Sequence, residues 1–65
     1  MNVQTAMASW GVLGKPNALA SASRYELERI AQVLWQEIMT KDSVEEKIVA
    51  AYKALQIELK LRKRT

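Results

Sequence analysis

One short pattern occurs twice in this chain of 65 residues and constrains its fold more than any other feature. Residues 23–26 (Ser-Arg-Tyr-Glu) and 43–46 (Ser-Val-Glu-Glu) both read S-x-x-E, and a run with helical apolar spacing follows each of them. A serine at the N-cap of a helix accepts a hydrogen bond from the amide three residues later, while the glutamate reaches back to the serine amide. No alternating strand pattern separates the two starts, so the sequence predicts an all-α protein built on an antiparallel helical hairpin.

The two helices of this hairpin differ in their apolar faces. The first is predicted from about Tyr25 to Thr40 and has one main apolar stripe. The second, from about Val44 to Lys63, has two stripes that lie about 140° apart at 100° per residue. One stripe consists of Val44, Ile48, Ala51, Tyr52, Leu55 and Leu59, and the other of Ala50, Ala54, Ile57 and Leu61. The hairpin covers one stripe, so the other needs a further neighbour, either the N-terminal segment or another chain; we favour another chain.

The N-terminal segment, residues 1–13, has the apolar spacing of a short helix or arm. Gly14 is placed to close this helix in a left-handed conformation, and Pro16 prevents the helix from continuing. The segment is therefore predicted to end before the hairpin begins.

Residues 14–22 are predicted to form a linker of small residues that leads into the hairpin of residues 23–65. Asn17 offers an alternative and earlier cap for the next helix, because asparagine is a favourable N-cap residue. The serine–glutamate pattern favours the later start at Ser23.

The composition excludes several kinds of chemistry. The chain contains no cysteine and no histidine, so it forms no disulfide and lacks the usual ligands of structural zinc. The commonest general base and the commonest activated nucleophiles are absent for the same reason. The seven acidic residues fall at predicted helix starts or on solvated faces. We therefore expect a protein that is not an enzyme and has no catalytic residue, metal, cofactor or small-molecule substrate.

The apolar content favours assembly with another chain. Proteins of this size bury a modest fraction of their surface and often rely on disulfides, a metal or a second subunit. Since 49% of the residues are apolar and the first two devices are absent, we expect a homodimer that binds a larger protein. Tryptophan is enriched at interface centres, so the predicted interface adds one tryptophan to the second stripe. It consists of Trp10, Ala50, Ala54, Ile57 and Leu61.

The basic residues support a second hypothesis. The net charge is +3, from ten basic and seven acidic residues, and residues 43–65 hold the whole excess. A basic stripe on a helix can follow nucleic-acid phosphates, although cations near the end of a helix also complement its dipole. The chain has no recognisable helix-turn-helix spacing. The candidate nucleic-acid contacts share one polar face: Lys53, Gln56, Lys60, Lys63 and Arg64.

Two functional hypotheses follow. The first is a small non-enzymatic regulatory protein that acts by protein–protein binding as a homodimer. Small helical chains without histidine and cysteine are frequent among accessory factors of phages and mobile elements, which is an association by composition alone. The alternative is a small dimeric nucleic-acid-binding regulator. Because the chain lacks a basic signal-peptide start and a long apolar run, we expect a soluble, cytoplasmic protein without membrane contact.

Overall fold

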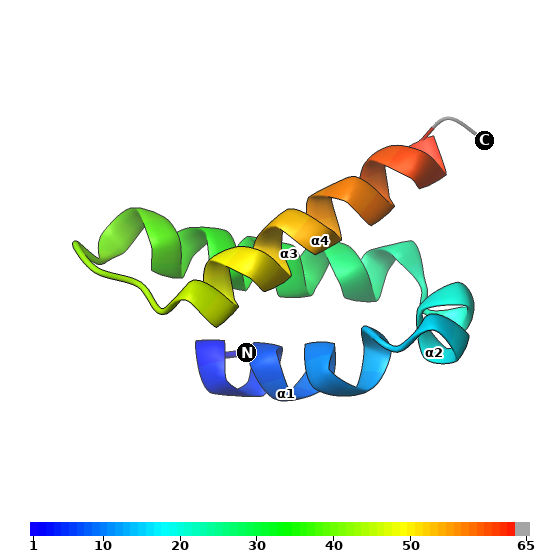
Figure 1. Cartoon of the computed structure of the whole chain (residues 1–65), viewed down its shortest axis with the longest axis horizontal. Helices are drawn as coiled ribbons and strands as arrows, with labels where there is room; N and C mark the ends of the chain where they lie inside the picture. The colour runs from blue at the N-terminus through cyan, green and yellow to red at the C-terminus, as the bar shows by residue number, and fades with distance from the viewer. Residues whose placement is uncertain (64–65) are drawn as a thin grey trace.

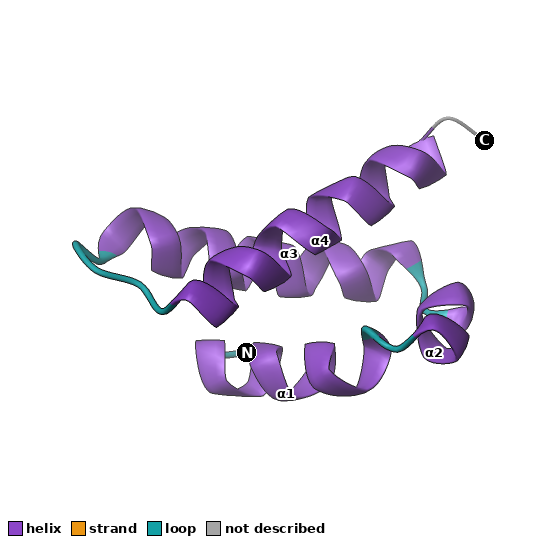
Figure 2. Cartoon of the chain, in the orientation of Figure 1, coloured by secondary structure: helices purple, strands orange, loops and turns teal. Residues whose placement is uncertain are grey.

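The computed structural model describes residues 1–63, with side chains up to residue 62. That range is all-helical and holds four helices, which confirms the predicted all-α class (Figure 2). They are α1 (Val3–Leu13), α2 (Pro16–Ser21), α3 (Arg24–Thr40) and α4 (Glu46–Lys63). None of these helices, over the described residues, combines the length and the apolar content that a membrane span requires.

The helices pack together around α3, as Figure 1 shows. Helix α4 returns over α3 and crosses it obliquely, so that the C-terminal half of α4 diverges from the first half of α3. Helix α1 runs alongside α3 and also contacts α4. The short α2 forms the corner between α1 and α3. This arrangement leaves one side of α4 without a neighbouring helix in the part of the chain that the structure describes.

The core lies where α1, α3 and α4 meet. Its largest fully buried side chains are Leu27, Ile30 and Leu34 of α3 and Leu55 of α4. Burial of each such side chain contributes about 1.5–3 kcal/mol to the stability of the fold. The main stripe predicted for α3 and the first stripe predicted for α4 are both confirmed as faces that pack into this core.

Two helix starts are fixed by side-chain caps. The Asn2 side chain accepts a hydrogen bond from the Thr5 amide at 2.8 Å, and Ser23 Oγ accepts one from the Glu26 amide at 3.1 Å. Each bond satisfies an amide that has no partner inside its helix. The predicted N-terminal helix is thus confirmed as α1, and the first S-x-x-E pattern locates the start of α3.

The second S-x-x-E pattern does not start α4, so the predicted cap at Ser43 and the predicted start at Val44 are wrong. Helix α4 begins at Glu46, and Ser43 lies in a bend within the connection of residues 41–45. Packing explains the difference. Lys41 leaves α3 in an extended conformation, with φ −111° and ψ 140°, and Val44 packs against the core from the connection.

The predicted linker of residues 14–22 contains a short helix, α2, that the sequence analysis did not anticipate. Pro16 occupies the first position of α2, where the missing amide would be unpaired in any case. Asn17 therefore lies inside the helix, and the alternative cap proposed there is wrong. Gly14 ends α1 in a right-handed conformation, with φ −73°, and not in the predicted left-handed one. The reason is that the chain leads directly into α2.

One arginine connects the end of α4 to the end of α2. Arg62 donates from Nη1 to the Ala22 carbonyl at 2.6 Å and from Nη2 to the Leu19 carbonyl at 2.7 Å. Its Nε also donates to Glu58 Oε1 at 3.2 Å. The Leu19 carbonyl also accepts a hydrogen bond from the Ala22 amide at 3.2 Å, so the guanidinium uses its second lone pair.

Candidate functional site

The second apolar stripe of α4 points away from the core. We call these four residues, Ala50, Ala54, Ile57 and Leu61, the outer face of α4. Ile57 is 62% exposed and Leu61 is 57% exposed, although both are large aliphatic side chains. Helix α1 packs into the core with α3 and α4 and leaves Ile57 and Leu61 exposed. A group of large apolar residues left exposed on one helix is a candidate interaction surface.

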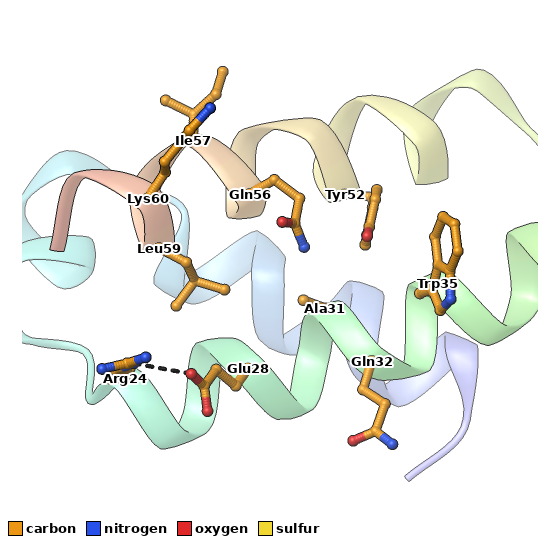
Figure 3. A pocket seen from close by; sticks show the side chains of 10 residues that line it. All are labelled: Arg24, Glu28, Ala31, Gln32, Trp35, Tyr52, Gln56, Ile57, Leu59 and Lys60. Carbon is orange, nitrogen blue, oxygen red and sulfur yellow. Dashed lines mark hydrogen bonds and ion pairs between the residues drawn. The ribbon is translucent and has the colours of Figure 1, made fainter. Parts of the chain in front are cut away.

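An open groove of about 630 Å³ lies beside the outer face, between α3 and α4 (Figure 3). The side chains of Leu59 and Gln56 project from α4 into the groove. Those of Ile57 and Lys60 point away from α3, on the outer side of α4. Ile57 thus belongs both to the groove rim and to the outer face. The groove is lined by Arg24, Glu28, Ala31, Gln32, Trp35, Tyr52, Gln56, Ile57, Leu59 and Lys60.

An aromatic pair occupies one end of the groove. The rings of Trp35 and Tyr52 are stacked, with centroids 5.4 Å apart and an interplanar angle of 26°. Trp35 remains 45% exposed in this position. Stacked aromatic pairs are favoured by about 0.5–1.5 kcal/mol beyond their burial, and tryptophan and tyrosine are enriched among the residues that dominate binding energies. The groove therefore presents an accessible aromatic surface.

Charged side chains occupy the other end of the groove. Arg24 Nε and Glu28 Oε1 form an ion pair at 2.9 Å, and both side chains are about half exposed. Lys60 is exposed on the α4 rim. An exposed ion pair contributes little to stability, so these groups give the groove polarity without holding it together.

The predicted nucleic-acid contacts divide into three groups in the structure. Gln56 and Lys60 line the groove, where they lie beside Ile57 of the predicted protein interface. Lys53 is exposed on α4 outside the groove lining. The Lys63 side chain and Arg64 lie outside the described residues.

Trp10, the remaining residue of the predicted interface, belongs to α1. It is partly buried and packs against the core. Its ring lies close to Gly14: a methyl group added to Gly14 would lie 3.1 Å from Trp10 Cε2. The structure therefore places Trp10 within the fold and apart from the outer face and the groove.

The Trp35–Tyr52 pair and the Arg24–Glu28 pair were not predicted as site residues. Helical projections place both aromatic residues at the edges of apolar stripes. Only the crossing of α4 over α3 brings the two edges together, and the sequence carries no signal for that crossing.

Within the described residues, no group of three or more acidic side chains could hold a metal ion.

Comparison with family models, curated proteins and solved structures gave no match to this chain.

Proposed function

We propose that this chain is a small, non-enzymatic regulatory protein that acts by binding other protein chains, and that it works as a homodimer of helical hairpins. The exposure of Ile57 and Leu61 on the outer face of α4 is the observation that carries this proposal. Burying such side chains against a partner removes apolar surface from water, which is the main favourable term in most protein association. The lack of histidine and cysteine supports a role without catalysis.

The proposal assigns different tasks to the two surfaces. The outer face of α4 mediates self-association, and the groove contacts the target protein. Support for the second assignment comes from the stacked Trp35 and Tyr52, since Trp35 remains 45% exposed while it stacks on Tyr52. Such aromatic residues lose little conformational entropy on binding and offer a large contact area.

The proposal is tested by the mass of the protein in solution. We expect a dimeric sedimentation mass for the natural chain and a melting temperature that rises with protein concentration, because association stabilises the folded state by mass action. Replacing Ile57 and Leu61 together by serine should give a monomer that keeps its helical circular dichroism. Val12→Ser is the matched control, because Val12 is 65% exposed on α1 and lies outside both surfaces. A monomeric natural chain whose melting is independent of concentration would contradict the homodimer.

The nucleic-acid alternative has exposed Lys53 and Lys60 in its favour. Arg62, however, is bonded to α2, which removes one cation from the polar surface of α4. Titration with duplex DNA at two salt concentrations distinguishes the two functions. Phosphate binding would weaken as salt rises, with a log–log slope of about −0.9 for each phosphate neutralised. We expect no association at physiological salt; tight binding that disappears on changing Lys53 and Lys60 to glutamine would replace our proposal.

A further inference from the structure

The groove between α3 and α4 has a contact between distant segments at each of its ends. At one end, Trp35 of α3 stacks on Tyr52 of α4, with ring centroids 5.4 Å apart. At the other end, Leu59 and Lys60 line the groove, and Arg62 follows them closely in α4. Arg62 donates hydrogen bonds to the corner that α2 forms before α3. The α4 wall of the groove is therefore connected to the rest of the molecule at both ends.

The bonds of Arg62 define the position of the last turn of α4. Its Nε donates to Glu58 Oε1 one turn earlier in α4, which orients the guanidinium. Nη1 and Nη2 then donate to the Ala22 and Leu19 carbonyls at 2.6 and 2.7 Å. The Arg62 side chain is only 24% exposed. Hydrogen bonds of a charged group are shorter and stronger than neutral ones, and the planar guanidinium fixes their directions.

Apolar packing does not position this end of α4 in the same way. Leu55 is fully buried, but Leu59, one turn later, is only partly buried. Lys60 and Leu61, which come next, are exposed. The hydrogen bonds of Arg62 therefore hold a part of α4 that the core does not bury.

From these contacts we infer that Arg62 is the positioning residue of the groove, and that it keeps the α4 wall at a fixed distance from the α3 wall in the absence of a bound partner. Arg62 itself is not among the residues that line the groove, so it acts through the position of α4. At this end the α3 wall consists of Arg24 and Glu28, which follow the corner that Arg62 contacts (Figure 3).

This inference rests on the proposed role of the groove in binding a target protein, and it adds that the binding surface is formed before the target arrives. A preformed surface binds more tightly than one that must be ordered first, because less conformational entropy is lost. Arg62 is then a determinant of affinity although it makes no contact with the target.

Distances between spin labels test the inference on the full chain, which has no natural cysteine to remove. One variant carries labels at Tyr25→Cys and Lys60→Cys, exposed positions of α3 and α4 at the Arg62 end. The matched control carries them at Gln36→Cys and Lys53→Cys, exposed positions beside the aromatic pair. Labelled chain is mixed with an excess of unlabelled chain, so that pulsed electron paramagnetic resonance records distances within one chain whether or not it dimerises.

Arg62→Met removes the hydrogen bonds and keeps an unbranched apolar side chain. We expect it to broaden the distance distribution between positions 25 and 60 and to leave that between positions 36 and 53 unchanged, at a temperature where circular dichroism shows intact helices. Arg62→Lys keeps the charge but not the planar fork, so it should give an intermediate width. If Arg62→Met does not fold, the natural chain is compared with Arg62→Lys alone.

Two results would overturn the inference. An unchanged distribution between positions 25 and 60 in the folded variants would show that α4 holds its position without Arg62. Equal broadening of both distributions would show that Arg62 stabilises the whole fold and does not position this wall in particular. Neither result depends on self-association or on a target, so a chain of monomeric mass would contradict the proposed homodimer and leave this inference standing.

Discussion

The contact between Trp10 and Gly14 shows how a single residue adjusts the packing of α1. Gly14 has an ordinary right-handed conformation, so its backbone geometry does not require glycine. Glycine is required at this position because there is no room for a side chain. A methyl group there would lie 2.8 Å from the Trp10 carbonyl oxygen and 3.1 Å from the Trp10 ring. The other glycine of the chain, Gly11, has no heavy atom within 4 Å of the same position.

We therefore expect opposite effects when each of the two glycines is replaced by alanine. Gly14→Ala should destabilise the fold by about 1–3 kcal/mol, the usual range for overpacking, because the Trp10 carbonyl and the Trp10 ring must both shift to admit the methyl group. Gly11→Ala should stabilise it by about 0.5–1 kcal/mol, since alanine favours the interior of a helix. Thermal denaturation of both variants measures the difference. Equal effects of the two substitutions would show that the Trp10 ring does not rest on Gly14.

At the scale of the helices, the two S-x-x-E serines have the same sequence context but different structural roles. Ser23→Ala should destabilise the fold by about 0.5–2 kcal/mol, because it removes the bond that caps α3. Ser43→Ala should change stability by less than about 0.5 kcal/mol, as is usual for an exposed site away from such features. Urea denaturation at fixed protein concentration compares the two variants. A large loss of stability in Ser43→Ala, without a loss in Ser23→Ala, would show that Ser43 caps α4.

The same comparison shows how far sequence predicts this fold. The boundaries of α1 and α3 could be predicted because local features define them, namely an apolar period followed by Gly14 and Pro16, and a serine cap at residue 23. The start of α4 could not be predicted, because Val44 packs against the core from the connection, although its local sequence pattern favours a helix start. Tertiary packing competes with a capping preference here, because even the partial burial of a valine side chain contributes free energy of the same order as one cap.

The candidate site was predictable only in part for a similar reason. The second stripe of α4 could be recognised by periodicity alone, and the structure leaves Ile57 and Leu61 exposed. The groove depends on the oblique crossing of two helices, and a stripe does not specify a crossing angle. Trp35 and Tyr52 therefore appear as neighbours only in three dimensions.

In the whole molecule, Arg62 joins segments that lie 40 and 43 residues apart in the sequence. Helix α2 has only six residues, which is too short to be stable by itself. No residue of α2 is fully buried, although Leu19 packs against the core. The guanidinium therefore provides a substantial part of what keeps α2 in place.

This connection makes α2 and the last turn of α4 one cooperative unit in local unfolding, since opening either segment breaks the hydrogen bonds that order the other. In hydrogen–deuterium exchange, the amides of Leu19 and Ala22 should exchange at rates close to those of the last turn of α4 and faster than those of the core helix α3. Arg62→Met should accelerate exchange in both segments together, while Lys60→Met, at an exposed position two residues earlier, should leave α2 unchanged. Faster exchange confined to α4 would show that α2 holds its place without the arginine. If both segments respond, the corner formed by α2 and the last turn of α4 open and close together while the core remains folded.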